Sequence, residues 1–170
     1  MSPTAETRTL IDALKFNDEV LKVSLTGMSD ELACRRLRDG GPSVAWNIGH
    51  MLYHRNQIAA AVSCGGPAVD LEPYRSTATD GDDYPPLQRL QPAWLEFSDR
   101  LRSTLSRLSP ADLSAPSPIQ LPHGEQTLLD ALRFVVWHEG LHLGQVAMLR
   151  SHHGLTPVAT LIVEGAAAAT

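Results

Sequence analysis

The amino-acid sequence predicts an all-α protein with the architecture of a four-helix bundle. Four segments repeat apolar residues every three or four positions, the spacing that lines one face of an α-helix. No stretch alternates apolar and polar residues for long enough to predict a β-strand. A hydrophobic fraction of 43% over 170 residues is sufficient for one buried core. We therefore expect a single helical domain that spans residues 1–170.

The first half of the chain contains two long predicted helices and one short one. The first helix follows a cap at Ser2 and runs to about Leu25. A short helical piece capped by Ser29 comes next, and Ser43 then caps a second long helix that ends near Ser63. These side chains can accept hydrogen bonds from the first free N–H groups of a helix, which is why they indicate helix starts.

The second half contains the other two long helices. Residues from about 64 to 86 are rich in Gly, Pro and Asp and predict a long loop. Thr127 opens the fourth helix, which continues to about His153, and a flexible tail is expected over about 165–170. The apolar stripe of the third helix predicts core positions at Leu90, Trp94, Phe97, Leu101, Leu105 and Leu108. The long connections allow crossovers between the helices.

Composition and chain ends exclude several classes of protein. The chain has 14 Lys and Arg against 19 Asp and Glu, a net charge of -5, so no nucleic-acid partner is expected. No apolar run approaches the ~20 residues of a membrane helix, and the N-terminus does not read as a secretory signal. Two cysteines without CxxC spacing predict neither a disulfide framework nor a cysteine zinc site. We expect a reduced, cytoplasmic protein with no membrane association.

Four of the seven histidines form two pairs with helical spacing. His50 and His54 lie on the second predicted helix, and His138 and His142 lie on the fourth. Residues four apart project from the same face of a helix, so each pair can converge on one point. The second pair falls within the apolar stripe of its helix and is expected to point into the bundle. The periodicity of the second helix does not decide whether His50 is buried.

Buried imidazoles need partners for their ring nitrogens. Burial without a partner costs about 1 to 3 kcal/mol per polar group. A metal ion bound by His138 and His142 removes this cost, and this is the favoured interpretation. The alternative is that each ring is a core histidine bonded to a carbonyl or carboxylate. His123, His152 and His153 have no comparable partner and are expected to face solvent.

Residues 138–142 also satisfy the HExxH motif of zinc proteases, in which Glu139 would be the general base. The metzincin extension of this motif fails, because Gln145 occupies its Gly position and Met148 the position of its third His. A gluzincin ligand would have to be Glu164, near the end of the chain, and no accompanying sheet is expected. The sequence therefore disfavours a protease.

Longer segments resemble the DinB/YfiT-like family, whose members are regarded as metalloenzymes. The sequence HEGLHLGQ at residues 138–145 is similar to the last helix of that family. The sequence SVAWNIGHML at residues 43–52 is similar to its second helix, where the first metal ligand is found. Further matches occur at residues 28–32, residues 122–127, Leu149-Arg150 and Gly154. The resemblance covers nearly the whole chain and is weak only over about 65–86.

The resemblance implies a DinB-like bundle with crossover connections, of the up-up-down-down type. It also implies a divalent metal held by three histidines, which correspond to His50, His138 and His142. His54 is additional, and could support a ligand, act as a fourth ligand, or serve as an acid or base beside the metal. Together with His54, Glu139 and Gln145 could position reactants. Glu139, however, lies about 100° around the helix from His138, the ligand that precedes it.

Three neutral imidazoles leave coordination positions open, as in catalytic rather than structural sites. Zinc and nickel suit this ligand set best, and manganese and iron are also accepted. The resemblance favours a transferase or isomerase in which a low-molecular-weight thiol, such as mycothiol, bacillithiol or glutathione, attacks a small-molecule substrate. Two alternatives are a hydrolase that uses metal-bound water, and a protein that binds metal or a small molecule without turnover.

The fourth helix carries small or apolar residues on the side opposite its histidines. These are Val136, Gly140, Leu143, Gly144 and Ala147. A helix that is apolar nearly all round is usually buried on both sides. The two glycines cost about 1 kcal/mol each in helix propensity, which suggests close approach by another helix. That helix lies either in the same bundle or in a second subunit, and the family resemblance supports a homodimer.

Overall fold

The computed structural model describes residues 3–37, 41–76 and 84–168 of the chain. Its elements, in order, are α1 (Ala5–Ser24), α2 (Asp30–Cys34), α3 (Val44–Ala61), the 3-10 turn η1 (Glu72–Tyr74), α4 (Leu87–Leu105), α5 (Pro110–Leu113), α6 (Leu128–His152) and α7 (Val158–Ala168). The described residues form helices and no strand, which confirms the predicted all-α class.

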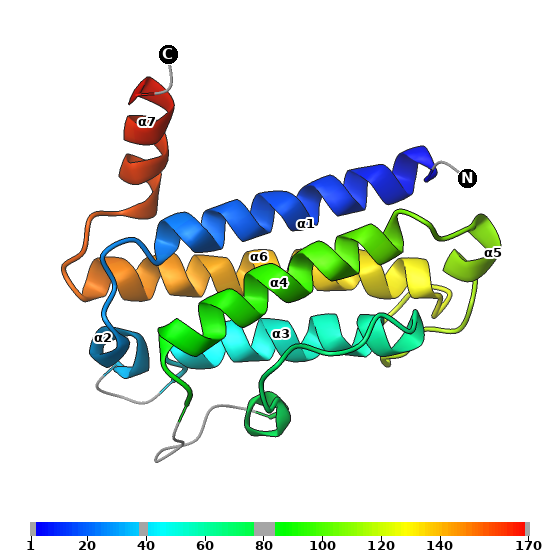
Figure 1. Cartoon of the computed structure of the whole chain (residues 1–170), viewed down its shortest axis with the longest axis horizontal. Helices are drawn as coiled ribbons and strands as arrows, with labels where there is room; N and C mark the ends of the chain where they lie inside the picture. Colours follow the sequence, from blue (N-terminus) through cyan, green and yellow to red (C-terminus); the bar gives the residue numbers. More distant parts are fainter. Residues whose placement is uncertain (1–2, 38–40, 77–83, 169–170) are drawn as a thin grey trace.

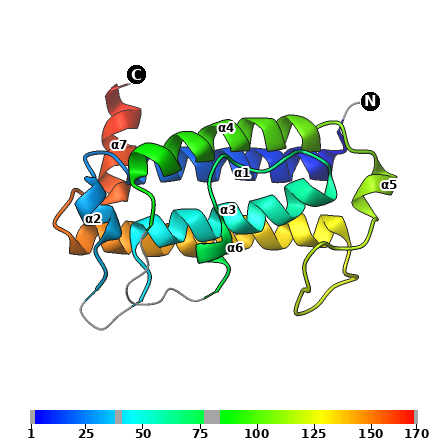
Figure 2. The same cartoon turned by 60° about the horizontal axis from the view of Figure 1, so that its bottom comes forward.

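Four long helices, α1, α3, α4 and α6, form the bundle (Figure 1). Helices α1 and α3 each pack against both α4 and α6, so α1 and α3 are diagonal to one another. In Figures 1 and 2, α1 and α6 run in one direction, and α3 and α4 run in the other. The order is thus up-down-down-up, which differs from the expected up-up-down-down. Since α3 and α4 are parallel, the chain between them returns along the bundle, and the long loop supplies the length.

Side-chain caps define the starts of the main helices. Ser29, Ser43 and Thr127 accept hydrogen bonds from backbone N–H groups three residues ahead, as predicted. Helix α1 begins after Thr4, whose side chain accepts from the N–H of Thr7. The cap expected at Ser2 lies outside the described residues. Thr4 performs this role because its hydroxyl directly precedes the first helical turn.

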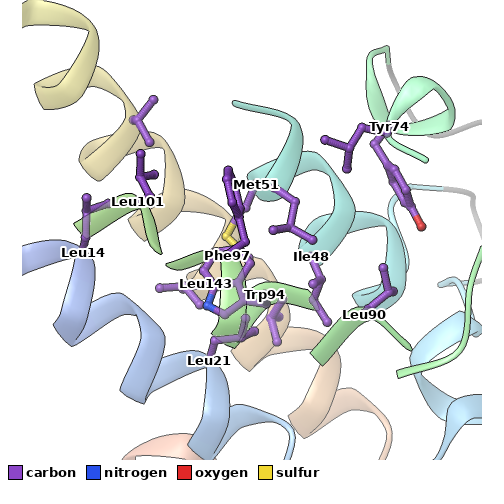
Figure 3. Packing of buried hydrophobic residues seen from close by; sticks show 14 of the residues in the cluster. Leu14, Leu21, Ile48, Met51, Tyr74, Leu90, Trp94, Phe97, Leu101 and Leu143 are labelled. Carbon is purple, nitrogen blue, oxygen red and sulfur yellow. The ribbon is translucent and has the colours of Figure 1, made fainter. Parts of the chain in front are cut away.

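The core lies between the four long helices, and Figure 3 shows part of it. The stripe predicted for α4 is buried from Leu90 to Leu105, and Trp94 and Phe97 are 1% and 0% exposed. Leu108 lies beyond the end of α4 and is only partly buried. Other large residues of the same buried core are Leu14, Leu21, Ile48, Met51, Leu52 and Leu132. The amphipathic period thus identified the inner face of α4 correctly.

The predicted loop and tail contain helical residues that the sequence analysis did not assign. The loop after α3 includes η1, and residues 77–83 of this loop lie outside the described residues. Helix α7 packs against α1 and extends through Ala168, so it includes the first part of the expected tail. In Figure 1 it points away from the bundle. None of the described helices combines the length and apolar character needed to cross a membrane.

Candidate metal centre

Three histidines from two helices come together on one side of the bundle. His50 lies on α3, and His138 and His142 lie on α6. One ring nitrogen of each lies within 4.8 Å of the others, close enough for a single ion to contact all three. His138 and His142 are 8% and 6% exposed, and His50 is partly buried. Helices α3 and α6 pack directly together, which is why residues so distant in the sequence meet.

Hydrogen bonds to two of these rings fix which nitrogen carries the proton. Nδ1 of His142 donates to Oδ1 of Asn47 at 2.7 Å, and Nδ1 of His50 donates to the Tyr74 carbonyl at 2.7 Å. The Asn47 amide is oriented by its own donation to the Ser43 carbonyl at 2.8 Å. Because these oxygens can only accept, both rings keep a lone pair on Nε2. This is the tautomer that a metal site requires.

The Nε2 atoms of His138 and His142 face each other at 3.0 Å. Since His142 carries its proton on Nδ1, its Nε2 presents a lone pair toward the His138 ring. Two nitrogens that face each other in a mostly buried site can both act as ligands of one cation. The ring of His50 completes the group, with centroids 4.9 Å from His142 and 5.1 Å from His138.

The position of His50 depends on close packing around one glycine. A Cβ on Gly49 would lie 2.1 Å from a ring carbon of Tyr74, which is fully buried. The absence of a side chain at Gly49 therefore allows η1 to lie against α3, with the Tyr74 carbonyl at the His50 ring. On its other side, His50 stacks on Trp46, with centroids 4.4 Å apart and an interplanar angle of 15°. The ring is held by contacts from both directions.

His54 lies beside the three histidines without belonging to their convergent group. Its ring centroid is 4.3 Å from that of His138 and 4.8 Å from that of His50. Its Nδ1 is buried and has no hydrogen-bond partner within the described part of the chain. Burial, with the nearby rings of His50 and His142, lowers the pKa of His54 to about 4. The ring is therefore neutral at pH 7.

The same environment keeps the other rings neutral. Burial, together with the neighbouring histidines, lowers the pKa of His138 to about 3, and burial and His50 lower that of His142 to about 4. Burial also lowers the pKa of His50, while its bond to the Tyr74 carbonyl opposes this change. Metal ligation requires the neutral imidazole, and these rings are in that form at neutral pH.

Glu139 is in a different place from that expected of a protease base. Its side chain is fully buried, and both carboxylate oxygens accept hydrogen bonds from Arg55. Asn17 donates to the same carboxylate at 2.9 Å. A role as acid or base would first require this ion pair to break. Adjacent helical residues point about 100° apart, so His138 can face the metal site while Glu139 faces the core.

The remaining residues singled out in the sequence lie around or away from the centre. Gln145 follows His142 by one helical turn and is partly buried, and its Oε1 has no hydrogen-bond partner in the described chain. His123 and His152 are exposed as predicted, whereas His153 is partly buried and Nε2 of this ring is shielded from solvent. None of these four residues belongs to the convergent group.

Two groups at the centre had no assigned role in the sequence analysis. Asn47 precedes His50 by three residues on α3, so its position on that face was recognisable. Its partner His142 is 95 residues away, and only the packing of α3 on α6 reveals the bond. The contribution of Tyr74 is a backbone carbonyl, and no residue type could have indicated it.

A comparison with models of protein families gives a match. A family model described as the DinB superfamily matches residues 13–146, well over half of the sequence. The chain belongs to the DinB superfamily. The matched region includes His50, His138 and His142, and it ends before α7. A search of curated proteins finds no match. The DinB resemblance noted at the two histidine segments is thus confirmed, and the three-histidine group fits a metal-binding member of the superfamily.

Proposed function

We propose that this DinB-superfamily protein binds a divalent metal through His50, His138 and His142 and uses it to activate a low-molecular-weight thiol. The reaction is the transfer of that thiol to an electrophilic small molecule, or an isomerisation that depends on it. The observation that carries the proposal is the convergence of three neutral rings on one point. The imidazole set suits zinc and nickel best, and manganese and iron are compatible with it.

A divalent ion bound there supplies a Lewis acid that lowers the pKa of a thiol or water in its open position. The residues of this chain favour the thiol. Such an ion, held by these three histidines, would favour the deprotonated form of a thiol without a strong base. The carboxylate nearest in sequence to the ligands, Glu139, is occupied by Arg55.

A cavity that is lined in part by Phe134, a residue in contact with His138, is suited to a small-molecule substrate. It has a volume of about 500 Å³, within the range of ligand pockets. Phe134 and Trp137 of α6 form one wall, and Leu121 and Pro122 form another. The Phe134 ring stacks on His138, with centroids 5.5 Å apart and an interplanar angle of 24°. The apolar part of the lining favours an electrophile with an aromatic or aliphatic body, and Phe134 connects the cavity to the proposed ligand His138.

Hydrolysis is the second candidate function, and it would depend on His54. A hydrolase needs a base that takes a proton from water, and the unpartnered Nδ1 of His54 could serve as that base. Binding of metal or a small molecule without turnover is the third outcome that the experiments below distinguish.

The first experiment measures metal content. Elemental analysis of the purified protein is expected to give about one divalent ion per chain, and much less in the three variants His50→Ala, His138→Ala and His142→Ala. His152→Ala is the matched control, because it removes an exposed histidine from the same helix. Equal, low metal content in wild type and all variants would overturn the proposed site.

The second experiment separates the candidate functions. The metal-loaded protein is incubated with mycothiol, bacillithiol or glutathione and a model electrophile, and separately with ester and amide substrates. Thiol consumption that is lost in His138→Ala and kept in His152→Ala supports the transferase. Cleavage of esters or amides without any thiol supports the hydrolase. Metal binding with no turnover in either assay supports a binding protein.

We further propose that the outer face of α6 forms a homodimer interface. Trp137, Leu141 and Met148 are 62%, 50% and 58% exposed, and they recur at helical spacing. Between them, a Cβ added to Gly140 or Gly144 would meet no described atom within 4 Å, so no helix of the described chain covers this face. Leu143, which the sequence placed on this side, is instead buried inside the subunit. A second copy of the chain with the same apolar face would cover it.

Light scattering tests the dimer. Wild type at micromolar concentration is expected to have twice the mass of one chain, and Leu141→Glu is expected to shift it to the monomer, because a charge would be buried at the interface. Leu95→Glu is the control, since Leu95 is exposed on α4, the helix diagonal to α6. A monomeric wild type would contradict the proposal.

A further inference from the structure

A buried polar cluster, distinct from the histidines, connects all four long helices. The side chain of Arg55 on α3 is fully buried at its centre. Its Nε and Nη2 both donate to the carboxylate of Glu139 on α6, with 2.8 Å between Nη2 and Oε2. Its Nη1 donates to Asp18 of α1 at 2.9 Å, and to Ser98 of α4. Asn17 of α1 adds a hydrogen bond to Glu139.

Asp18 is the second junction of the cluster. Besides Arg55, it accepts a hydrogen bond from Nε1 of Trp94 at 2.8 Å and forms an ion pair with Arg102. The guanidinium of Arg55 also lies 4.1 Å from the centroid of the Trp94 ring. Two arginines thus face two carboxylates, so the cluster has no net charge, as burial requires.

Two members of the cluster are the direct sequence neighbours of histidines, one on α3 and one on α6. Arg55 directly follows His54, and Glu139 directly follows His138. Consecutive residues of a helix point about 100° apart, so one member of each pair faces the histidines while the other faces the core. A rotation or slide of α3 against α6 that altered the Arg55 to Glu139 bonds would also alter the spacing of the histidines on these two helices.

We propose that the Arg55 to Glu139 ion pair positions the metal ligands by fixing the rotation and register of α3 against α6. This inference rests on the proposed metal centre. Two parallel N–H to oxygen bonds have one favourable geometry, so they add geometric specificity to the contact between α3 and α6. The pair therefore acts on the site through the helices that carry the ligands, and neither residue touches the ion.

Two substitutions test the proposal in the full-length protein. Glu139→Gln keeps the shape of the side chain and removes its charge. Arg55→Lys keeps the charge and loses the parallel bonds. Zinc affinity is measured by competition with a chromophoric chelator, and ligand geometry by the visible spectrum of the Co²⁺-loaded protein. We expect both variants to bind zinc about 10- to 100-fold more weakly, the range found when groups supporting metal ligands are removed, and to show an altered spectrum.

Arg150→Met is the matched control. Arg150 is also a buried arginine and lies on α6, eight residues after His142. It donates to the backbone carbonyls of Ser24, Thr26 and Thr156, and does not take part in the cluster. Its loss is expected to lower Tm while zinc affinity and the Co²⁺ spectrum stay as in wild type. A purely structural role for Arg55 and Glu139 would give the same result in their variants.

The outcomes are distinguishable. Wild-type zinc affinity and spectrum in folded Glu139→Gln and Arg55→Lys would overturn the positioning role. Absence of zinc binding by the wild type would overturn the metal centre itself. If either single variant fails to fold, the double variant Arg55→Met with Glu139→Met leaves no charge unpaired and gives the decisive measurement. Weaker zinc binding by that folded variant supports the proposal, and unchanged binding contradicts it.

Discussion

Asn47 does for His142 what the Tyr74 carbonyl does for His50, because each oxygen accepts a hydrogen bond from Nδ1. Single atoms thus set the tautomers on which the proposed metal centre depends. The spacing of His138 and His142 on one helix was sufficient to predict that they converge. The role of Asn47 was not predictable in the same way, because its bond crosses from one helix to another.

Replacement of Asn47 tests this residue-scale interpretation. Asn47→Leu leaves the Nδ1–H of His142 buried without an acceptor and lets the ring turn. We expect zinc affinity to fall by about 10- to 100-fold, measured by chelator competition. Asn56→Leu, on the same helix but without a hydrogen bond to any of the four rings, is the control. A folded Asn47→Leu protein with unchanged affinity would contradict the role assigned to Asn47.

Gly49 in α3 and Gly140 in α6 differ in how closely they are packed, although glycine is unfavourable in the interior of either helix. Gly49 is covered by the Tyr74 ring, whereas Gly140 has no described atom near its missing side chain. The sequence marked the glycines of α6 as sites of close approach. It did not mark Gly49, because η1 was predicted as loop and its position against α3 is a tertiary contact.

Alanine at each position gives a paired prediction at the scale of the element. Gly49→Ala forces a methyl group into the buried Tyr74 ring, and we expect the free energy of unfolding to fall by about 1 to 3 kcal/mol. Gly140→Ala meets no steric barrier within the subunit and gains about 1 kcal/mol of helix propensity in the monomer. Urea unfolding of both variants measures the difference. Equal effects would show that Tyr74 moves aside at little cost.

The four histidines make the stability of the whole molecule depend on pH. Their pKa values are lowered in the folded protein, to about 4 for His54 and His142 and about 3 for His138. The ordinary value is 6.5, and it applies to the unfolded chain. Between these values the unfolded chain binds protons that the folded chain does not. Their contribution to stability is therefore complete above pH 6.5 and decreases as the pH falls towards 4.

Urea unfolding of the metal-free protein between pH 7.5 and pH 4.5 tests this expectation. The free energy of unfolding should decrease steadily below pH 6.5, because protonation favours the unfolded chain. His54→Phe removes one titrating ring and should make the decrease less steep, whereas the exposed His152→Ala should leave it unchanged. A free energy that is constant over this range would mean that the rings are not buried as neutral groups.

At the scale of the whole chain, the sequence by itself determined the helical class, the caps at Ser43 and Thr127, and the two histidine pairs. These follow from local rules, because a cap and an i, i+4 spacing depend on residues within one helix. The tertiary structure decided the up-down-down-up order, the engagement of Glu139 by Arg55, and the meeting of α3 with α6 at the three histidines. Each of these depends on which helices become neighbours, and that is set by packing between segments far apart in the sequence.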